Sequence, residues 1–201
     1  MKKSKSEETG YAGERGSVFG MTMKAAGSAL AVLLCTASAV WAAGPASDNA
    51  SDPVYADAGG GNFAGLNGGG GFGEWQVSPD ANTDTAGAFI GDSNGNGSGN
   101  GPGINSDGDV AFGLFANSGD QVEAIRPLGS VLEDGQVLAI DVDVGSLGGN
   151  ALQAVGLLDG DGLIRFELVA RAGSGTYIIN DSEAEIDTGI PLAEGGIRVT
   201  I

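Results

Sequence analysis

Short apolar runs separated by turn residues are the feature that most constrains how this chain folds. Turns such as Glu133-Asp134-Gly135 and Asp159-Gly160-Asp161-Gly162 divide the runs, and Asp-Gly and Asn-Gly pairs supply the positive φ that hairpin turns require. Turn signals spaced about 8–12 residues apart are typical of a β-sandwich or barrel. The predicted strands cover residues 73–77, 86–90, 110–116, 121–125, 136–144, 151–158, 163–170, 176–180 and 197–201.

Polar and apolar residues alternate with a period of two in several of these runs. Asp141 and Asp143 alternate with apolar residues in one run, and Arg165 and Glu167 do so in another. This pattern indicates antiparallel strands that bury one face. The sequence therefore predicts an all-β fold, an antiparallel β-sandwich of jelly-roll or concanavalin A-like type, over residues 71–201.

The N-terminal 42 residues have the pattern of a secretory signal peptide. Basic residues come first, an apolar run follows over 25–42, and small residues around Ala39 and Ala42 form an Ala-x-Ala-like cleavage site. The alternative is a transmembrane helix, but the run is near the lower limit of the roughly 17–25 residues that a span needs. We expect cleavage after Ala42, no stable membrane span afterwards, and a secreted, extracellular or cell-surface location. The single cysteine, Cys35, lies in the apolar run.

The two ends of the remaining chain carry separate predictions. Residues 43–70 are rich in glycine, asparagine and serine and are expected to form a flexible lead-in. At the other end, the sequence stops inside an apparent strand, 196–201, which would leave an unpaired sheet edge. Either this strand has an internal partner, or another chain completes the sheet, or the chain is a fragment truncated at its C-terminus. We favour the fragment.

Composition excludes several classes of function. The chain has no histidine, so it has neither a histidine-based catalytic triad nor a histidine-ligated zinc site. It has 9 basic and 26 acidic residues and a net charge of −17, which argues against a nucleic-acid partner. Five of the basic and three of the acidic residues lie in the leader, so residues 43–201 carry four arginines, 23 acids and a charge of −19.

A series of short motifs resembles a poorly characterised all-β module of secreted bacterial surface proteins. Such modules occur alone or beside glycoside hydrolases. The resemblance implies a jelly-roll or lectin-like sandwich and brings no established activity. Its motifs are Gly71-Phe72-Gly73-Glu74-Trp75, Gly87-Ala88-Phe89-Ile90-Gly91-Asp92-Ser93, Ile104-Asn105-Ser106-Asp107-Gly108, Phe112-Gly113-Leu114-Phe115-Ala116-Asn117-Ser118-Gly119, Ala124-Ile125-Arg126-Pro127, Tyr177-Ile178-Ile179-Asn180-Asp181 and Asp187-Thr188-Gly189-Ile190-Pro191.

One loop has the pattern of a structural calcium site. Asp92, Asn94 and Asn96 alternate oxygen-bearing side chains ahead of a glycine at the sixth position, as at the start of a calcium loop. The bidentate glutamate of the twelfth position is missing, and Asp107 and Asp109 would add charge if the loop folds back. The alternative is a flexible loop without metal. The related run at 159–162 is predicted to be a hairpin turn.

Aromatic residues are the candidates for carbohydrate binding, because flat rings stack on the apolar faces of sugars. We single out Trp75, Tyr177 and Phe115, although core packing is the favoured interpretation for Trp75, and Phe89 is expected in the core. No glutamate stands out as a catalytic acid, so no enzyme is expected. The sequence predicts a non-catalytic secreted module that binds a polysaccharide or surface glycan. The alternative is a structural or adhesive surface domain without a small ligand.

Overall fold

The protein is nearly all β, as expected. The structure is a computed structural model that describes residues 19–26, 46–56, 62–78, 84–94, 103–104, 106–117, 119–181, 183–192 and 195–201. Within these ranges the regular structure is antiparallel strands, one short helix, α1 (Pro53–Ala56), and a 3-10 turn at Asp107–Asp109. None of the described helices is long and apolar enough to cross a membrane.

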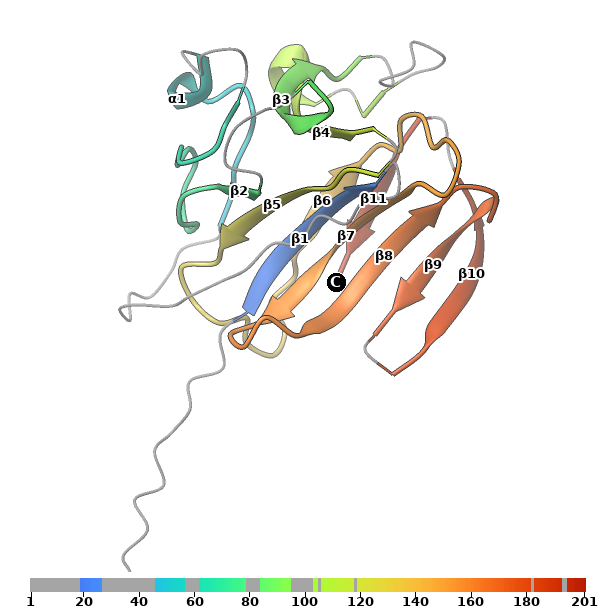
Figure 1. Cartoon of the computed structure of the whole chain (residues 1–201). Coiled ribbons are helices and arrows are strands. Elements are labelled where there is room, and N and C mark those ends of the chain that lie inside the picture. Colours follow the sequence, from blue (N-terminus) through green and yellow to red (C-terminus); the bar gives the residue numbers. More distant parts are fainter. Residues whose placement is uncertain are drawn as a thin grey trace, which may run out of the picture.

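A seven-stranded antiparallel sheet forms the main layer (Figure 1). Its strands follow one another in space as β10, β9, β8, β7, β1, β5 and β2. Consecutive strands β7 to β10 form a meander, whereas β1 lies between β7 and β5. The strands are β1 (Phe19–Ala26), β2 (Gln76–Ser78), β5 (Val122–Pro127), β7 (Leu152–Asp159), β8 (Ile164–Arg171), β9 (Thr176–Asn180) and β10 (Glu185–Pro191).

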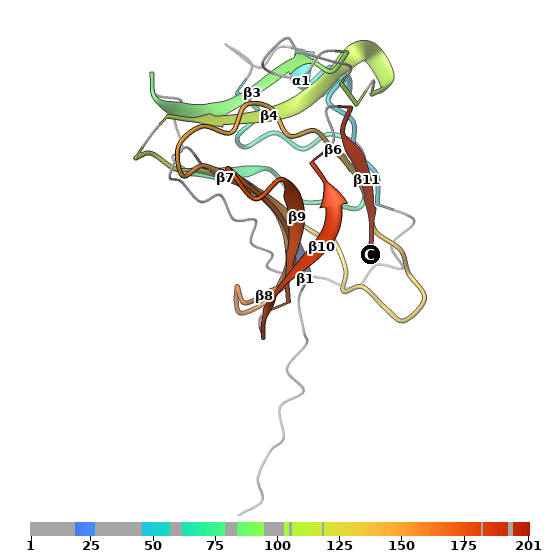
Figure 2. The ribbon, with the colours of Figure 1, turned by 90° about the vertical axis from the view of Figure 1, so that its right-hand side faces the viewer.

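Two strand pairs cover one face of this sheet and give the molecule its sandwich-like form (Figure 2). The hairpin of β3 (Ala86–Asp92) and β4 (Val110–Ala116) packs over the β2–β5 end, where Ala88 and Ala124 share one hydrophobic cluster. The pair of β6 (Ala139–Val142) and β11 (Ile197–Thr200) packs over β7 to β9 in a second cluster. The predicted antiparallel sandwich is confirmed at this level.

The strand predictions succeed where turn residues flank an apolar run. The structure reproduces 110–116 and 176–180 as β4 and β9, and most other predicted strands shift by a few residues. Strand β10 was not predicted, because most of its residues are exposed on both faces and show no buried stripe. Glu167 was expected on the solvent face of β8, but it is 4% exposed and its Oε2 accepts a 3.2 Å hydrogen bond from Asn180.

The C-terminal strand has a partner within the chain. β11 pairs antiparallel with β6, with Ile197 opposite Val142 and Thr200 opposite Ala139. Of the three alternatives for 196–201, the structure shows an internal partner on one side of the strand. At the other end, β1 lies inside the predicted leader, whereas 27–45 lie outside the described residues. Export and cleavage stay predictions.

The described part of the expected lead-in is packed rather than flexible. Tyr55 is 3% exposed and Phe63 is fully buried, and both belong to the cluster under the β3–β4 hairpin. Burial of these two side chains holds the segment in place despite its glycine-rich composition, because burying an aromatic side chain contributes about 1.5–3 kcal/mol to stability. The sandwich domain therefore includes residues well before the predicted boundary at 71.

Arg126 on β5 ties this N-terminal segment to the sheet. Its side chain is fully buried and forms an ion pair with Asp48. Its guanidinium also donates hydrogen bonds of 2.7 Å to the Asn67 Oδ1 and Gly68 carbonyl oxygens and of 3.0 Å to the Tyr55 hydroxyl. These contacts pair Arg126 with a carboxylate and order the end of β5.

Candidate functional site

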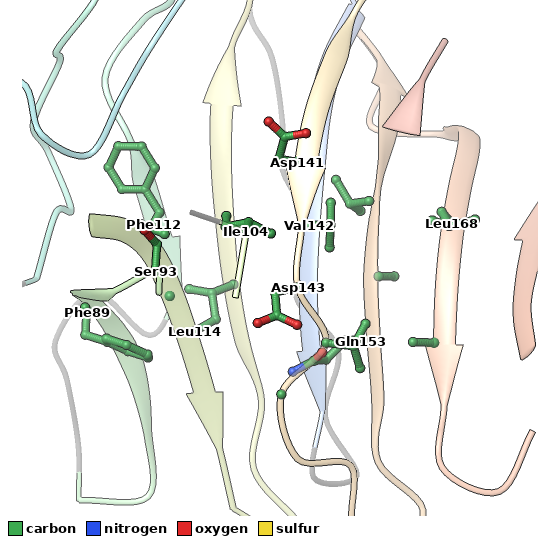
Figure 3. A pocket seen from close by; sticks show the side chains of 18 of the residues that line it. Phe89, Ser93, Ile104, Phe112, Leu114, Asp141, Val142, Asp143, Gln153 and Leu168 are labelled. Carbon is green, nitrogen blue, oxygen red and sulfur yellow. The ribbon is translucent and has the colours of Figure 1, made fainter. Parts of the chain in front are cut away.

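A cavity of about 190 Å³ lies between the β3–β4 hairpin, β6 and the face of β7 to β9 (Figure 3). Its walls come from strands that are distant in the sequence, so the sandwich assembles it. Its lining includes Phe89, Asp141, Asp143, Gln153, Leu168 and Tyr177.

Strand register places the floor of the cavity on one face of the large sheet. Gln153 is paired with Ala170, and Ala170 is paired with Tyr177. Directly paired residues of an antiparallel sheet project to the same face, so these three side chains share the floor. Leu168, two residues from Ala170, lies on this face as well. The floor is therefore mainly apolar, and Gln153 interrupts it.

Two buried oxygen atoms face this cavity without a hydrogen-bond partner in the described part of the protein. They are Oδ1 of Asp143 and Oε1 of Gln153. Figure 3 shows both side chains among those that line the cavity, Asp143 just after β6 and Gln153 on β7. Burial raises the pKa of Asp143, and a backbone hydrogen bond from Val144 only partly offsets that effect. A buried acceptor without a donor is unfavourable by about 1–3 kcal/mol, so the pair favours a ligand with hydrogen-bond donors.

Asp141, two residues earlier and on β6, has a different environment. Its two carboxylate oxygens accept hydrogen bonds of 2.8 and 2.7 Å from Arg198 on β11. These bonds lower the pKa of Asp141, although partial burial opposes the shift. β6 thus carries one carboxylate neutralised by an arginine, and the residue just after its end carries one carboxyl group without such a partner.

Phe89 forms an aromatic platform at the rim of the cavity. It is 37% exposed, and its ring covers the two glycines Gly91 and Gly113. A Cβ atom at Gly113 would lie 2.3 Å from the ring, and one at Gly91 would lie 2.8 Å from it. The missing side chains let the ring lie close to the hairpin backbone. Phe115, 36% exposed, has its ring centroid 6.2 Å away.

The structure places the three aromatic residues predicted to bind carbohydrate in different environments. Phe115 is partly exposed beside Phe89, and carbohydrate binding stays a prediction for it. Trp75 is 2% exposed and packs against Phe63 with a 5.0 Å centroid distance, so its ring has no free face for a sugar. Tyr177 is 1% exposed and also offers no exposed stacking surface, but it lines the cavity.

The expectation that Phe89 belongs to the core is wrong, because its ring lies at the surface over two glycines. The sequence did carry a signal for this position, which was missed. Glycines lie two residues before and two residues after Phe89, so neither neighbour on its face of the strand has a side chain. Gln153 also carried a signal, as the one polar side chain inside the apolar run 151–158. Asp143 gave no signal of its own, because the alternation pattern assigned it to solvent.

The predicted calcium residues gather partly at one end of the β3–β4 hairpin. The Ser93 N–H donates a 3.0 Å hydrogen bond to the Asp109 carbonyl oxygen, which brings Asp92 and Asp109 to the same end. Asp92 Oδ1 accepts a 2.8 Å hydrogen bond from the Asn94 N–H, a local turn that uses one potential ligand atom. Asp107 lies in the adjoining 3-10 turn.

Asn96 lies outside the described residues. Among the residues that are described, no three or more histidine, cysteine, aspartate or glutamate side chains are grouped to hold a metal ion. Calcium stays a prediction at this loop. The turn prediction for 159–162 is confirmed, since Asp159 Oδ1 accepts hydrogen bonds from the N–H groups of Asp161 and Leu163 between β7 and β8.

The fold and the cavity define a sandwich-like all-β protein with a small, partly polar internal site. Comparisons with protein-family models, with curated proteins and with solved structures found no match. The resemblance to secreted bacterial modules therefore stays a prediction from the sequence motifs.

Proposed function

We propose that this protein is a secreted, non-catalytic module that binds a polysaccharide or surface glycan in the cavity beside β6. The observation that carries the proposal is the combination of an exposed aromatic ring, Phe89, with two unpaired buried acceptors, Asp143 Oδ1 and Gln153 Oε1, on one cavity. A sugar offers hydroxyl donors for the acceptors and an apolar ring face for the phenyl group.

The dimensions of the cavity favour one sugar unit or the end of a chain. About 190 Å³ is smaller than the roughly 300–1,000 Å³ of a typical small-molecule pocket. The neighbouring ring of Phe115 extends the apolar surface outside the cavity. A polymer whose terminal unit enters the cavity would therefore continue across the two phenyl rings of the hairpin.

Export supports this function and rests on the leader pattern of residues 1–42. The remaining chain carries a charge of −19 and no lysine, and such a surface repels other acidic polymers. We therefore expect neutral glycans to bind better than uronic-acid or sulfated ones.

Hydrolysis is the second candidate, because Asp141 and Asp143 both line the cavity, two residues apart, and their pKa values are shifted in opposite directions. Paired carboxyl groups of this kind divide the roles of acid and base in glycosidases. Release of reducing ends from a polysaccharide panel would support this candidate, provided that it disappears in Asp143→Asn.

The test is a glycan array followed by titration of the best ligand into the full chain. Phe89→Ala and Asp143→Asn should each weaken binding, whereas Leu163→Ala and Asp161→Asn remove an exposed apolar and an acidic side chain on the β7–β8 turn and should not. If no glycan binds, or if all four variants bind equally, the cavity is not a carbohydrate site and the structural or adhesive alternative gains support.

A further inference from the structure

Strand β1 occupies an inner position in the large sheet, although it belongs to the predicted leader. Gly20 to Ala25 pair with β5, and Phe19 to Ala26 pair with β7, antiparallel in both cases. Figure 1 shows this strand between the two neighbours. The backbone of β1 is therefore hydrogen-bonded on both sides.

Removing this strand would leave a gap with two open edges. β5 would keep only the three-residue strand β2 as a sheet neighbour, and β7 would keep β8. Since both are antiparallel to β1, β5 and β7 run parallel to each other and do not pair directly. Unpaired backbone groups at a sheet edge readily accept another strand, so the gap suits one strand that is antiparallel to both neighbours.

The residues that flank the gap specify what would fill it. With β1 in place, Val122, Ala124 and Leu158 are completely buried, and Ala154 and Leu157 are nearly so. Neighbouring residues of a strand project to opposite faces, so the gap is enclosed on both faces. An occupant should therefore be largely apolar, as β1 is apart from Thr22 and Lys24, and it should be extended and free of proline.

Register adds one charged position to this specification. Lys24 is the only charged residue of β1, and it lies directly opposite Glu123 of β5. Opposite charges in directly paired cross-strand positions are favourable. Residues 43–201 contain no lysine, and their four arginines, at 126, 165, 171 and 198, already lie in strands of the sandwich. A second processed copy therefore offers no free segment of this pattern.

We propose that the gap between β5 and β7 is a strand-binding site, filled by Phe19–Ala26 in the full-length chain and opened when the leader is removed. It then accepts one extended apolar segment, with a basic residue opposite Glu123, from another polypeptide. This inference rests on the export and cleavage proposed above for its physiological trigger, but the binding site itself is testable without them.

The first experiment places β1 in the sheet of the full-length chain. With Cys35→Ser as background, Met21→Cys and Leu157→Cys put cysteines at paired positions, whereas Met21→Cys with Gln153→Cys puts them four residues out of register. We expect oxidation to cross-link the first pair and not the second. Absence of the first cross-link would overturn the proposal.

The second experiment opens the gap. A protease site placed after Ala42 is cut in the folded chain, the leader fragment is removed in denaturant, and residues 43–201 are returned to buffer with or without a synthetic peptide of residues 17–28. We expect the peptide to bind one to one and to raise the melting temperature. A Lys24→Glu peptide should bind several-fold more weakly, and a Thr22→Pro peptide should not bind, because proline removes a ladder donor.

The outcomes separate the proposals. Failure of the peptide to bind the cut chain, whether that chain is folded or not, overturns the strand-binding site. The cut chain could instead form a dimer or a larger assembly. If the peptide dissociates that assembly, the result supports the strand-binding site. Mass spectrometry of the exported protein tests cleavage by itself: a retained leader would contradict the proposed trigger while leaving the peptide result intact.

Discussion

Arg126 and Asp48 form an ion pair inside the protein. This pair joins the N-terminal segment 46–56 to β5, an inner strand of the large sheet. Burial lowers the pKa of Arg126 to about 10, so the guanidinium remains charged at neutral pH. The carboxylate of Asp48, 8% exposed, balances that charge. The aromatic rings of Phe72 and Trp75 lie 4.9 and 5.1 Å from the guanidinium carbon. A planar, forked cation suits this enclosure better than an ammonium group.

Replacing Arg126 should therefore be strongly destabilising. Arg126→Met leaves Asp48 buried without its counter-ion, which is typically unfavourable by about 3–5 kcal/mol of unfolding free energy. Arg126→Lys should recover only part of that loss, because lysine cannot reproduce the fork. Urea unfolding followed by tryptophan fluorescence measures both. The matched control is Arg171→Lys, in an exposed pair with Glu185 at 2.7 Å, where a change of less than about 1 kcal/mol is expected.

The close contact between Phe89 and Gly113 leads to a prediction for the ligand site. Phe89→Ala should weaken glycan binding about tenfold, or ~1.4 kcal/mol, with little change in melting temperature because the ring is partly exposed. Gly113→Ala should weaken binding as well, since its Cβ would lie 2.3 Å from the ring and displace it. Titration calorimetry measures both effects. Equal affinity of Gly113→Ala and the unchanged protein would show that ring position is unimportant.

Local pattern predicted the fold well and the site poorly, for a physical reason. Period-two alternation and turn residues act over a few neighbours, so β4 and β9 were correct to the residue. The cavity depends on which strands meet across the sandwich. Asp143 looked like a solvent-facing residue because alternation gives only the face of a strand, and the β3–β4 hairpin that encloses it is far away in the sequence.

Long-range packing also explains the remaining differences between the predicted and the observed structure. The glycine-rich composition of 43–70 suggested flexibility, but Tyr55 donates a 2.8 Å hydrogen bond to Asp48 and accepts one from Arg126, so distant partners fix that segment. Likewise, nothing local indicated that Phe19–Ala26 would pair with strands more than 90 residues further along the chain.

Calcium binding at the β3–β4 loop is tested by a thermal melt in calcium chloride and in chelator. If Asp92, Asn94, Asn96, Asp107 and Asp109 bind the ion, calcium should raise the melting temperature, because a ligand that binds only the folded state stabilises it by mass action. Asp109→Asn should reduce the increase, whereas Asp161→Asn, on the separate β7–β8 turn, should not. Identical melting temperatures in calcium and chelator would mean that the loop binds no structural calcium.

We expect the buried carboxyl group of Asp143 to lower the stability of the folded protein, as is common for residues that bind a ligand. Burial raises its pKa in the folded protein, so the unfolded chain releases this proton at a lower pH than the folded one. The folded state then holds more protons in that window, and stability falls as pH rises through the ordinary aspartate pKa towards the raised value. Above that window the penalty is fully present, and below the ordinary pKa it is absent.

Asp143→Asn removes this penalty, so the variant should melt at a higher temperature than the unchanged protein at pH 7, and the difference should shrink towards pH 3. The same variant should bind glycan more weakly, because the amide replaces an anionic acceptor by a neutral one. Gain of stability with loss of binding is typical of residues kept for function. Melting curves at several pH values, with Asp161→Asn as control, measure the effect, and a lower melting temperature of Asp143→Asn at pH 7 would contradict it.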